Sequence, residues 1–422
     1  MEAYANVLTI AIVFFTVLIV IEFLASHIMG KQVYRAMDTI SSLSSGLTNN
    51  IKSIFKLSVI IISYDWMYSH LAQFNIQSTW LVYLIGFIGI DFASYWSHRW
   101  NHEINLFWNR HIIHHSSEEY NLACALRQSI SGIVQIYFFL YIPMAIIGVP
   151  PDVINIIAPL HLFAQFWYHT RLIGKMGFLE HIIMTPSHHR VHHAINKEYI
   201  DKNYSAIFIF WDKWFGTFQE ELPDVPPVYG VKKAVRTWNP MLINFQHVWQ
   251  ITKDAWYTKN WKDKARVWFM PTGWRPEDVK VKFPVDYVEN ANEQVKFDTP
   301  TTTGLTIWSF FQLNLHLLMQ IHMIMLLPSM SYVDLLLYGI FITVSIFAYS
   351  ALMDRHWVAV PAEMVKLACG FGLLYYLGDW YQLQQFFSYT IYLVAGYFII
   401  SAIVTSYYTF NKSTEKVKLE MA

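Results

Sequence analysis

Nine apolar segments, each about twenty residues long, alternate with more polar stretches along the chain. They cover residues 4–26, 54–74, 79–97, 130–149, 152–170, 304–327, 331–352, 357–377 and 386–408. A helix of about 20 apolar residues is long enough to cross a lipid bilayer. The pattern therefore predicts an all-α polytopic membrane protein with about nine transmembrane helices.

Two of these segments admit a second interpretation. A tight, proline-containing turn at residues 148–152 joins the segments 130–149 and 152–170. The pair forms either two complete spans or a hairpin that enters the membrane without crossing it. Residues 171–303 are the only sizeable non-membrane segment, and we expect them to form a helical cap on the cytosolic side.

The composition agrees with a membrane protein. Of the 422 residues, 55% are hydrophobic and 14% are charged, whereas soluble domains contain about 25% charged residues. Residues 3–21 and 304–333 contain no charge. The formal net charge is zero, so no nucleic acid or other polyanion is expected as a partner.

The lysine and arginine residues indicate the orientation. They gather after the first segment and in residues 98–129 and 171–303, whereas the turns at residues 75–78 and 148–152 have none. Basic loops stay on the cytosolic side of a membrane. With the N-terminus outside, nine spans place every basic loop in the cytosol. This predicts a protein of the bacterial inner membrane or the endoplasmic reticulum whose active site faces the cytosol.

Three short histidine blocks are the strongest chemical signal. His98 and His102 form an H-x3-H block, and residues 111–115 and 189–193 share the spacing H-x2-H-H. Positions i, i+3 and i+4 lie on one face of a helix, so each block can direct two or three imidazoles toward one point. Neutral imidazole is a common ligand for iron, zinc, copper and nickel.

Eight histidines are too many for one tetrahedral or octahedral ion, so the blocks predict two metals. Chance spacing in a histidine-rich chain is a weak explanation for three blocks. His169, at the end of the fifth segment, is expected to be a ninth ligand, while the deeper His161 is expected to be packed or hydrogen-bonded. The predicted ligands are His98, His102, His111, His114, His115, His169, His189, His192 and His193.

Two acidic residues near the blocks are the candidate catalytic side chains. Asp91 and Tyr95 lie on one helical stripe with the first block, and an acid inside a membrane helix is usually functional. We expect Asp91 to accept a hydrogen bond from a metal-ligating histidine, rather than to bond to another helix. Glu103 follows His102 directly. It is either a surface charge at a helix end or a ligand or proton carrier at the metals.

The expected substrate and metal follow from these surroundings. A long alkyl chain offers only C–H bonds, and oxidising them requires a strong metal-bound oxidant, which suits two irons and O2 better than zinc. Membrane helices supply a dry, apolar channel for such a lipid. The chain has neither a G-x-G-x-x-G nor a C-x-x-C-H motif. An external reductant must therefore supply the electrons.

The order and spacing of the blocks resemble the fatty acid hydroxylase/sterol desaturase superfamily of membrane di-iron enzymes, over about residues 85–220. Within it, the chain most resembles the alkylglycerol monooxygenase family. The features that carry this second resemblance are His102-Glu103, the run Trp211–Thr217, Tyr229-Gly230, Asn239-Pro240, Gly273-Trp274-Arg275-Pro276 and the C-terminal membrane unit. The chain departs from many superfamily members at Gln165, four residues before His169, where they carry a histidine or asparagine.

The resemblance implies roles for the site residues. The eight block histidines would be iron ligands, and Glu103 would be a functional acid. The implied reaction is O2-dependent hydroxylation of the ether-linked carbon of an alkylglycerol, whose hemiacetal product breaks down to a fatty aldehyde and glycerol. The implied reductant is tetrahydrobiopterin or another external electron donor.

The chain is accordingly divided into four parts. Residues 1–80 form N-terminal membrane helices, 81–220 a di-iron catalytic core of the fatty acid hydroxylase type, 221–303 a cytosolic cap and linker, and 304–422 C-terminal membrane helices.

Other functions fit part of the pattern. A sterol desaturase or hydroxylase, or a fatty acid hydroxylase acting on another lipid, would use the same ligands. A zinc-dependent membrane lipid hydrolase would need fewer ligands and an H-E-x-x-H arrangement, and His102-Glu103 lacks the second histidine of that motif. A metal transporter would place its ligands near the bilayer midplane, whereas these blocks lie at the ends of predicted spans.

Overall fold

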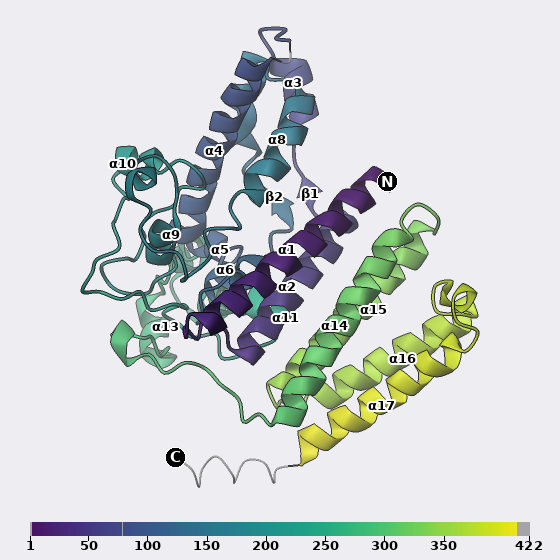
Figure 1. The fold of residues 1–422 in the computed structure, drawn as a ribbon. Helices are drawn as coiled ribbons and strands as arrows, with labels where there is room; N and C mark the ends of the chain where they lie inside the picture. Colours follow the sequence, from purple (N-terminus) through teal and green to yellow (C-terminus); the bar gives the residue numbers. More distant parts are fainter. Residues whose placement is uncertain (1, 78, 412–422) are drawn as a thin grey trace.

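The computed structural model describes residues 2–77 and 79–411 and is predominantly helical (Figure 1). The longer helices are α1 (Glu2–Ile28), α2 (Ala36–Ile54), α4 (Trp80–Glu103), α8 (Pro151–Phe163), α11 (Pro240–Tyr257), α14 (Thr303–Met325), α15 (Tyr332–Met353), α16 (Ala359–Leu377) and α17 (Thr390–Phe410). The shorter helices are α3 (Tyr64–Leu71), α5 (Asn105–Trp108), α6 (Ile112–His115), α7 (Ile142–Ile147), α9 (Pro186–His192), α10 (Phe210–Phe215), α12 (Trp261–Arg266) and α13 (Glu277–Lys282). The 3-10 turns are η1 (Cys124–Leu126), η2 (Phe138–Tyr141), η3 (Gly177–His181), η4 (Ala291–Glu293) and η5 (Leu383–Gln385). Within the described residues, the only strands are β1 (Val59–Ile60) and β2 (Val134–Gln135), which pair in parallel.

Five helices are long and apolar enough to cross a membrane: Thr9–Ile28 of α1, and α4, α15, α16 and α17. These five helices confirm five of the predicted spans, at residues 4–26, 79–97, 331–352, 357–377 and 386–408. The chain is therefore an integral membrane protein of the all-α class. The prediction of nine spans is not met, because the other four segments differ as follows.

Helix α14 has the length of a span but not the apolar character. It matches the predicted segment 304–327 in position. Polar side chains interrupt its sequence at Gln312, His316 and Gln320, and all three are buried against neighbouring helices. Polar residues at membrane depth usually face the bundle interior in this way.

The predicted span 54–74 is wrong, because this segment contains β1 and the short helix α3 instead of one helix. Two local features explain the break. The run Val59–Ile62 is entirely β-branched, which favours extended backbone over helix. Ser63 then starts a new helix by accepting a hydrogen bond from the backbone N–H of Trp66.

The predicted complete spans at 130–149 and 152–170 are also wrong. The first contains β2, η2 and the six-residue helix α7, and the second contains only the 13 residues of α8. A helix of 13 residues rises about 20 Å, which is less than the roughly 30 Å of a bilayer core. Gly148, with φ of +89°, ends α7 in the left-handed conformation. The pair has the lengths of the hairpin alternative, too short to cross.

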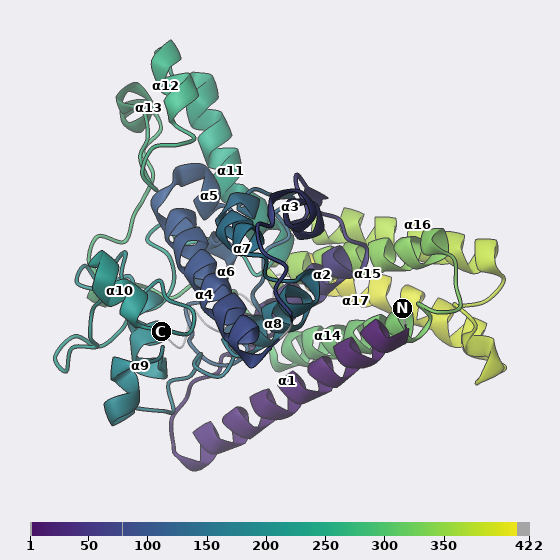
Figure 2. The same ribbon diagram turned by 90° about the horizontal axis from the view of Figure 1, so that it is seen from above.

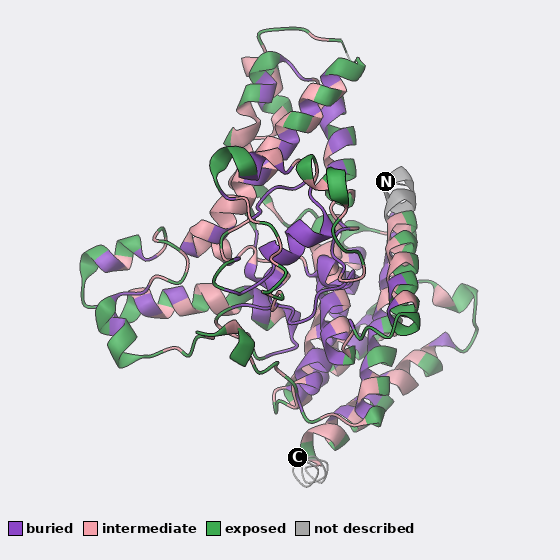
Figure 3. Cartoon of the chain, turned by 60° about the vertical axis from the view of Figure 1, so that its left-hand side comes forward, coloured by how far each residue is buried: buried purple, intermediate pink, exposed green. Residues whose placement is uncertain are grey.

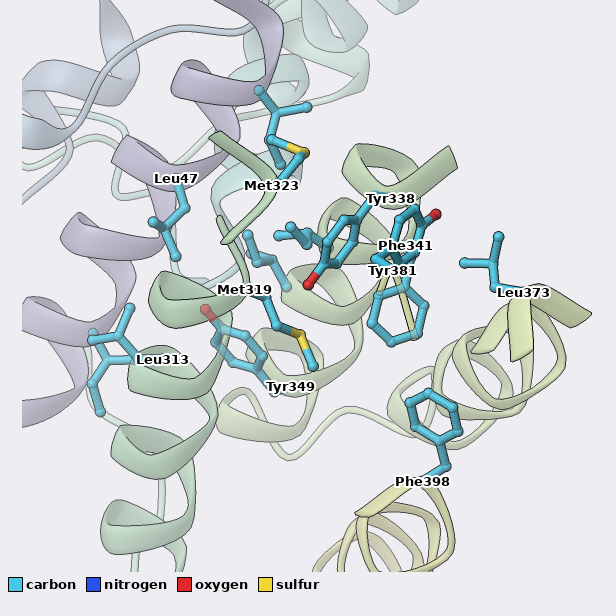
Figure 4. Close-up of a cluster of buried hydrophobic side chains, with 14 of the residues drawn as sticks. Leu47, Leu313, Met319, Met323, Tyr338, Phe341, Tyr349, Leu373, Tyr381 and Phe398 are labelled. Carbon is cyan, nitrogen blue, oxygen red and sulfur yellow. The ribbon is translucent and has the colours of Figure 1, made fainter. Parts of the chain in front are cut away.

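The largest hydrophobic core lies in the C-terminal unit of α14–α17 and includes side chains of α2 (Figure 4). Leu47 of α2, Met319 of α14 and Phe341 of α15 belong to this cluster. Gly370 of α16 lies so close to the ring of Phe398 on α17 that a methyl group there would stand 2.5 Å from ring carbons. Small residues allow membrane helices to approach in this way.

The other half of the molecule is organised around α4. Helix α8 packs along α4, and α5 and α6 follow directly after it. The loops and short helices of residues 104–129 and 164–240 fold around the C-terminal end of α4. Figure 3 shows the buried residues gathered in this central region and in the helix bundle beside it.

Candidate metal centre

Nine histidines converge at the C-terminal end of α4. They form two groups, in each of which the candidate ligand atoms all lie within 4.8 Å of one another. The five-histidine group is His98, His102, His111, His115 and His192, and the four-histidine group is His114, His169, His189 and His193. The structure thus brings together the eight histidines that the spacing singled out and His169, which was predicted from its place at the end of the fifth segment.

In the five-histidine group the imidazole nitrogens face each other at close range. The Nε2 atoms of His98 and His111 are 2.9 Å apart, and those of His115 and His192 are 3.1 Å apart. The Nε2 atom of His102 is buried and makes no hydrogen bond within the described part of the chain. This atom belongs to the same group and has no protein partner to occupy it.

The four-histidine group is arranged in the same way. Nε2 of His189 lies 2.9 Å from Nε2 of His169 and 3.1 Å from Nε2 of His193. Nε2 of His193 lies 3.1 Å from Nε2 of His114. The two groups adjoin, because the ring of His193 stacks on that of His115 with centroids 4.1 Å apart.

Each H-x2-H-H block divides its histidines between the two groups. In the block 111–115, on α6, the outer two histidines belong to the five-histidine group and His114 to the other. In the block 189–193, on α9, the outer two belong to the four-histidine group and His192 to the other. Each block thus directs two imidazoles toward one point, as its spacing predicted, but the third histidine of each H-x2-H-H block does not join them. The i and i+4 positions stay together, and the i+3 position turns to the neighbouring group.

Two ring nitrogens that point away from the five-histidine group are held by backbone carbonyl groups. Nδ1–H of His98 donates to the carbonyl oxygen of Tyr204 (2.7 Å), and Nδ1–H of His192 donates to that of Lys202 (2.9 Å). A neutral imidazole that donates from Nδ1 carries a lone pair on Nε2. These lone pairs point into the group, where they repel one another unless a cation lies between them.

The residues present fit two metal ions. Metal–imidazole bonds are about 2.1 Å long, so opposite ligands of one ion stand about 4.2 Å apart, comparable to the spread of each group. Five imidazoles exceed the three or four protein ligands of a zinc site. Neither group contains a carboxylate or thiol among the described residues, and all-imidazole ligation suits iron, copper, nickel or zinc rather than magnesium or calcium.

Burial keeps these imidazoles neutral. It lowers the pKa of His169 to about 4. The pKa of His189 is held well below its usual value, first by burial and then by neighbouring histidines. Burial disfavours the charged form of histidine. The ligating, neutral form is therefore the one present at neutral pH.

A short loop after α9 orients two of the histidines, and the sequence analysis missed it. Residues 201–204 supply the carbonyl groups that accept from His98 and His192. Asp201 and Asn203 have φ of 58° and 54°, in the left-handed region that costs most residues energy and that Asn and Asp tolerate best. A sequence signal was present, since Asp201 and Asn203 are turn-forming residues that follow the last histidine block within ten residues.

Buried side chains fix that loop in place. The amide of Asn203 donates to the carbonyl oxygens of His188 (3.0 Å) and Gln219 (2.7 Å). The carboxylate of Asp212 on α10 accepts from the backbone N–H groups of Tyr204 (2.8 Å) and Ser205 (2.9 Å). These contacts fix the positions of the two carbonyl groups.

Asp91 has different partners from those expected. It is fully buried and accepts from Nε2 of His161 (2.7 Å), Nε1 of Trp211 (2.9 Å) and the backbone N–H groups of residues 207 and 208. It makes no hydrogen bond to the nine histidines. The reason is distance, because residues seven apart on a helix, such as Asp91 and His98, are separated by about 10 Å along the axis. His161 is hydrogen-bonded, as expected.

Glu103 lies at the end of α4 beside the five-histidine group but outside it. Its carboxylate accepts from Nε of Arg99 at 2.8 Å, and its side chain is 37% exposed. This geometry fits both a charge at the helix end and a proton carrier beside the group. It does not place Glu103 among the candidate ligands.

A cavity of about 230 Å³ reaches the five-histidine group. Its walls include His102, His115 and His192 on one side and α11 on the other. Nε2 of Gln246 on α11 is buried and makes no hydrogen bond within the described part of the chain. The cavity therefore offers both metal-facing imidazoles and an unused hydrogen-bond donor to a small polar group.

Known proteins are similar in sequence to the histidine-containing core and to most of the chain. The family model described as fatty acid hydroxylase matches residues 83–217, which contain all nine histidines. No solved structure matches the chain.

Three relatives match over most of their length. Alkylglycerol monooxygenase of Homo sapiens is 36% identical over 368 residues, which cover 86% of this chain and 81% of that protein. The protein of the same name in Xenopus tropicalis is 33% identical, covering 84% of this chain and 79% of its own. That of Danio rerio is 31% identical, covering 90% and 84%.

Proposed function

The chain belongs to the alkylglycerol monooxygenase family, and we propose that it hydroxylates the ether-linked carbon of an alkylglycerol with O2. It is thus a lipid monooxygenase, and so an oxidoreductase. The finer proposal comprises the ether substrate, two iron ions as cofactors, and a metal centre that faces the cytosol. Its product, a hemiacetal, falls apart into a fatty aldehyde and glycerol.

One observation carries the proposal: two adjoining groups of five and four imidazoles whose lone pairs face inward. Two irons held by these nine histidines would supply the oxidising power that an unactivated C–H bond requires. The protein's part is to hold the ligands in position and to exclude water. Six of the nine histidines are buried and three are half-buried, and the carbonyl groups of residues 202 and 204 hold two of the imidazoles in position.

The cavity beside the five-histidine group suits the polar end of the substrate. The free amide N–H of Gln246 can donate to a glycerol hydroxyl, which fixes the head group next to the imidazoles. The ether carbon, one bond from the glycerol, then lies nearest the metals. The same cavity gives an external reductant, tetrahydrobiopterin or another donor, a route to the centre.

We assign supporting roles to the two acids. Glu103 has an exposed edge beside Arg99 and is the candidate that moves protons between solvent and the centre. Asp91 ties α4 to α10 through Trp211 and is a positioning residue. Both roles follow from contacts that the side chains make without any metal.

Lipid analysis of cells tests the proposal. Under air, cells that express the chain should lose alkylglycerol ether lipids and gain fatty aldehydes, compared with cells that express His192→Ala. The purified protein should contain about two irons per chain, and the variant should lose them. Full iron content in the variant would remove the ligand assignment. Unchanged ether lipids with altered sterols or hydroxylated acyl chains would assign a sibling activity, and lipid turnover without O2 would favour a zinc hydrolase.

A further inference from the structure

Helix α11 presents two chemically different faces. One face is a stripe of exposed apolar side chains, and the exposure continues through α12 and the residues after it. The exposed apolar residues of this arm are Leu242, Phe245, Trp249, Trp256, Tyr257, Trp261 and Phe269. On α11, positions 242, 245, 249 and 256 recur at helical spacing and share one side. Figure 2 shows α11 and α12 projecting away from the body of the molecule.

The opposite face of α11 is a wall of the metal cavity. His247, Gln250, Ile251 and Asp254 line that cavity together with the histidines. Asp254 is buried and holds Arg275 through a two-point ion pair with distances of 2.7 and 2.9 Å. The arm is therefore held firmly to the catalytic half, while none of the described residues covers its aromatic stripe.

The arm begins at the end of a membrane span. The side-chain amide of Asn239, the residue before α11, donates to the carbonyl oxygen of Phe347 in α15 (3.2 Å). The backbone N–H of Trp238 donates to the carboxylate of Asp354, the residue directly after α15, at 2.6 Å. The start of α11 is thus fixed at the depth where α15 leaves the membrane.

The arm also returns to the end of a membrane span. The backbone N–H groups of Asn105 and Leu106 donate to the carbonyl oxygens of Met270 (3.0 Å) and Trp268 (2.8 Å). These contacts lie two and three residues beyond Glu103, the last residue of the span α4. Both ends of the arm are therefore fixed where spans terminate, so the stripe between them lies near the membrane surface.

The exposed charge of the arm is positive. Its two acidic residues are buried and paired, Asp254 with Arg275 and Asp263 with Arg266. Lys259 and Lys262, by contrast, are exposed. Exposed tryptophan and basic residues at this depth are typical of elements that bind the interface of an anionic membrane.

We propose that α11 and α12 lie in the membrane–water interface, where their aromatic stripe and lysines bind anionic phospholipids beside the metal cavity. The arm is then a wall between bilayer and cavity, past which a lipid moves without leaving the membrane. This last step rests on the proposed function, whereas the membrane contact does not.

Fluorescence in nanodiscs tests the membrane contact independently of activity. A cysteine is placed at Trp249 or Trp256 in a Cys369→Ser background and labelled with an environment-sensitive dye, and Glu277→Cys on α13 is the matched control. The dye at 249 and 256 should be quenched severalfold more by brominated phospholipid than by iodide, and the reverse should hold at 277. Equal quenching by iodide at all three sites would overturn the proposal, whatever the protein's activity.

A kinetic test addresses the lipids. In nanodiscs with anionic phospholipid, the double variant Lys259→Glu/Lys262→Glu should raise KM for a long-chain substrate about fivefold per charge, with kcat and iron content unchanged. In nanodiscs of neutral lipid the two proteins should have the same KM. An unchanged KM in anionic lipid would remove the anionic preference. Absence of all turnover in the unmodified protein would contradict the proposed function and leave the quenching result standing.

Discussion

In the C-terminal unit, Glu363 and Lys366 of α16 are both buried, and their charges meet at 2.9 Å. Lys366 also donates to the hydroxyl of Ser401 on α17 at 2.6 Å. In the metal centre the buried groups are nine imidazoles of one kind, whose nitrogens face one another with no acid among them. The C-terminal unit pairs its buried charges with each other. Among the described residues, the metal centre contains only imidazoles, which suit a bound cation.

The comparison separates structural burial from functional burial. A buried charge with a hydrogen-bonded partner is complete and joins helices, which is the role of Glu363 and Lys366. Facing lone pairs with no proton between them repel one another. Bringing them together costs free energy of folding, which metal binding offsets. The histidine groups are therefore expected to depend on metal, and the α16 pair is not.

The largest effect should come from removing one imidazole of the cage. His189→Ala should release metal from the four-histidine group and lower turnover by more than about 100-fold, since loss of mere supporting contacts already costs 10–100-fold. His188→Ala is the matched control, because His188 precedes it on α9 but lies outside both groups. Metal analysis of the two purified variants checks this. Equal metal content would show that the cage does not depend on His189.

Breaking the α16 pair should affect stability and leave metal binding alone. Glu363→Gln leaves the charge of Lys366 buried without its partner, which should lower the free energy of unfolding by about 3–5 kcal/mol. The double variant Glu363→Leu/Lys366→Met should recover most of that loss. Denaturation in detergent measures both. Loss of metal from the folded fraction would show that the two regions are coupled.

The pH should change the protein's stability through Asp354, the residue directly after α15. Burial raises the pKa of Asp354, the residue after α15, to about 6 from a usual value of 3.8. Between these values the folded state binds more protons than the unfolded state, so this group's contribution to stability falls as the pH rises from about 4 to above 6. The stability of the unmodified protein relative to Asp354→Asn should therefore decrease over that window. Melting temperatures measured across it would refute this if the difference stayed constant.

The smallest effect should come from the loop that orients the cage. Asn203→Ala removes the amide contacts and places Ala in a left-handed conformation, whereas Asn203→Gly removes only the contacts. Both should weaken metal binding at the five-histidine group by about 10–100-fold, Ala more than Gly. Metal titration with a spectroscopic readout of the iron environment separates these effects from general unfolding. If both variants bind metal with the affinity of the unmodified chain, the loop does not contribute to metal binding.

The sequence predicted which histidines meet, but not how they are shared. Spacing identifies residues on one face, and in a single helix the positions i, i+3 and i+4 look equivalent. Which group His114 or His192 joins depends on how α6 and α9 face each other, and those helices are more than 70 residues apart. Only tertiary packing contains that information.

The sequence also overestimated the number of spans. Hydropathy identifies an apolar run but does not show where the helix within it breaks. The segments at 54–74 and 130–149 are apolar but are not continuous helices. The β-branched run before Ser63 and the left-handed Gly148 were visible in the sequence as local signals. The end of α8 at Phe163, by contrast, has no such signal in the sequence.

The five-histidine group has a consequence for the synthesis and metal loading of the protein. His98 and His192 share one group although 94 residues separate them in the chain. Ribosomes add about 5–20 residues per second, so the first histidine waits roughly 5–20 s before its partner exists. During that interval the early histidines form an incomplete chelator that would hold a wrong metal weakly. Correct loading is therefore a late event of biogenesis, after α9 has docked against α4 and α6.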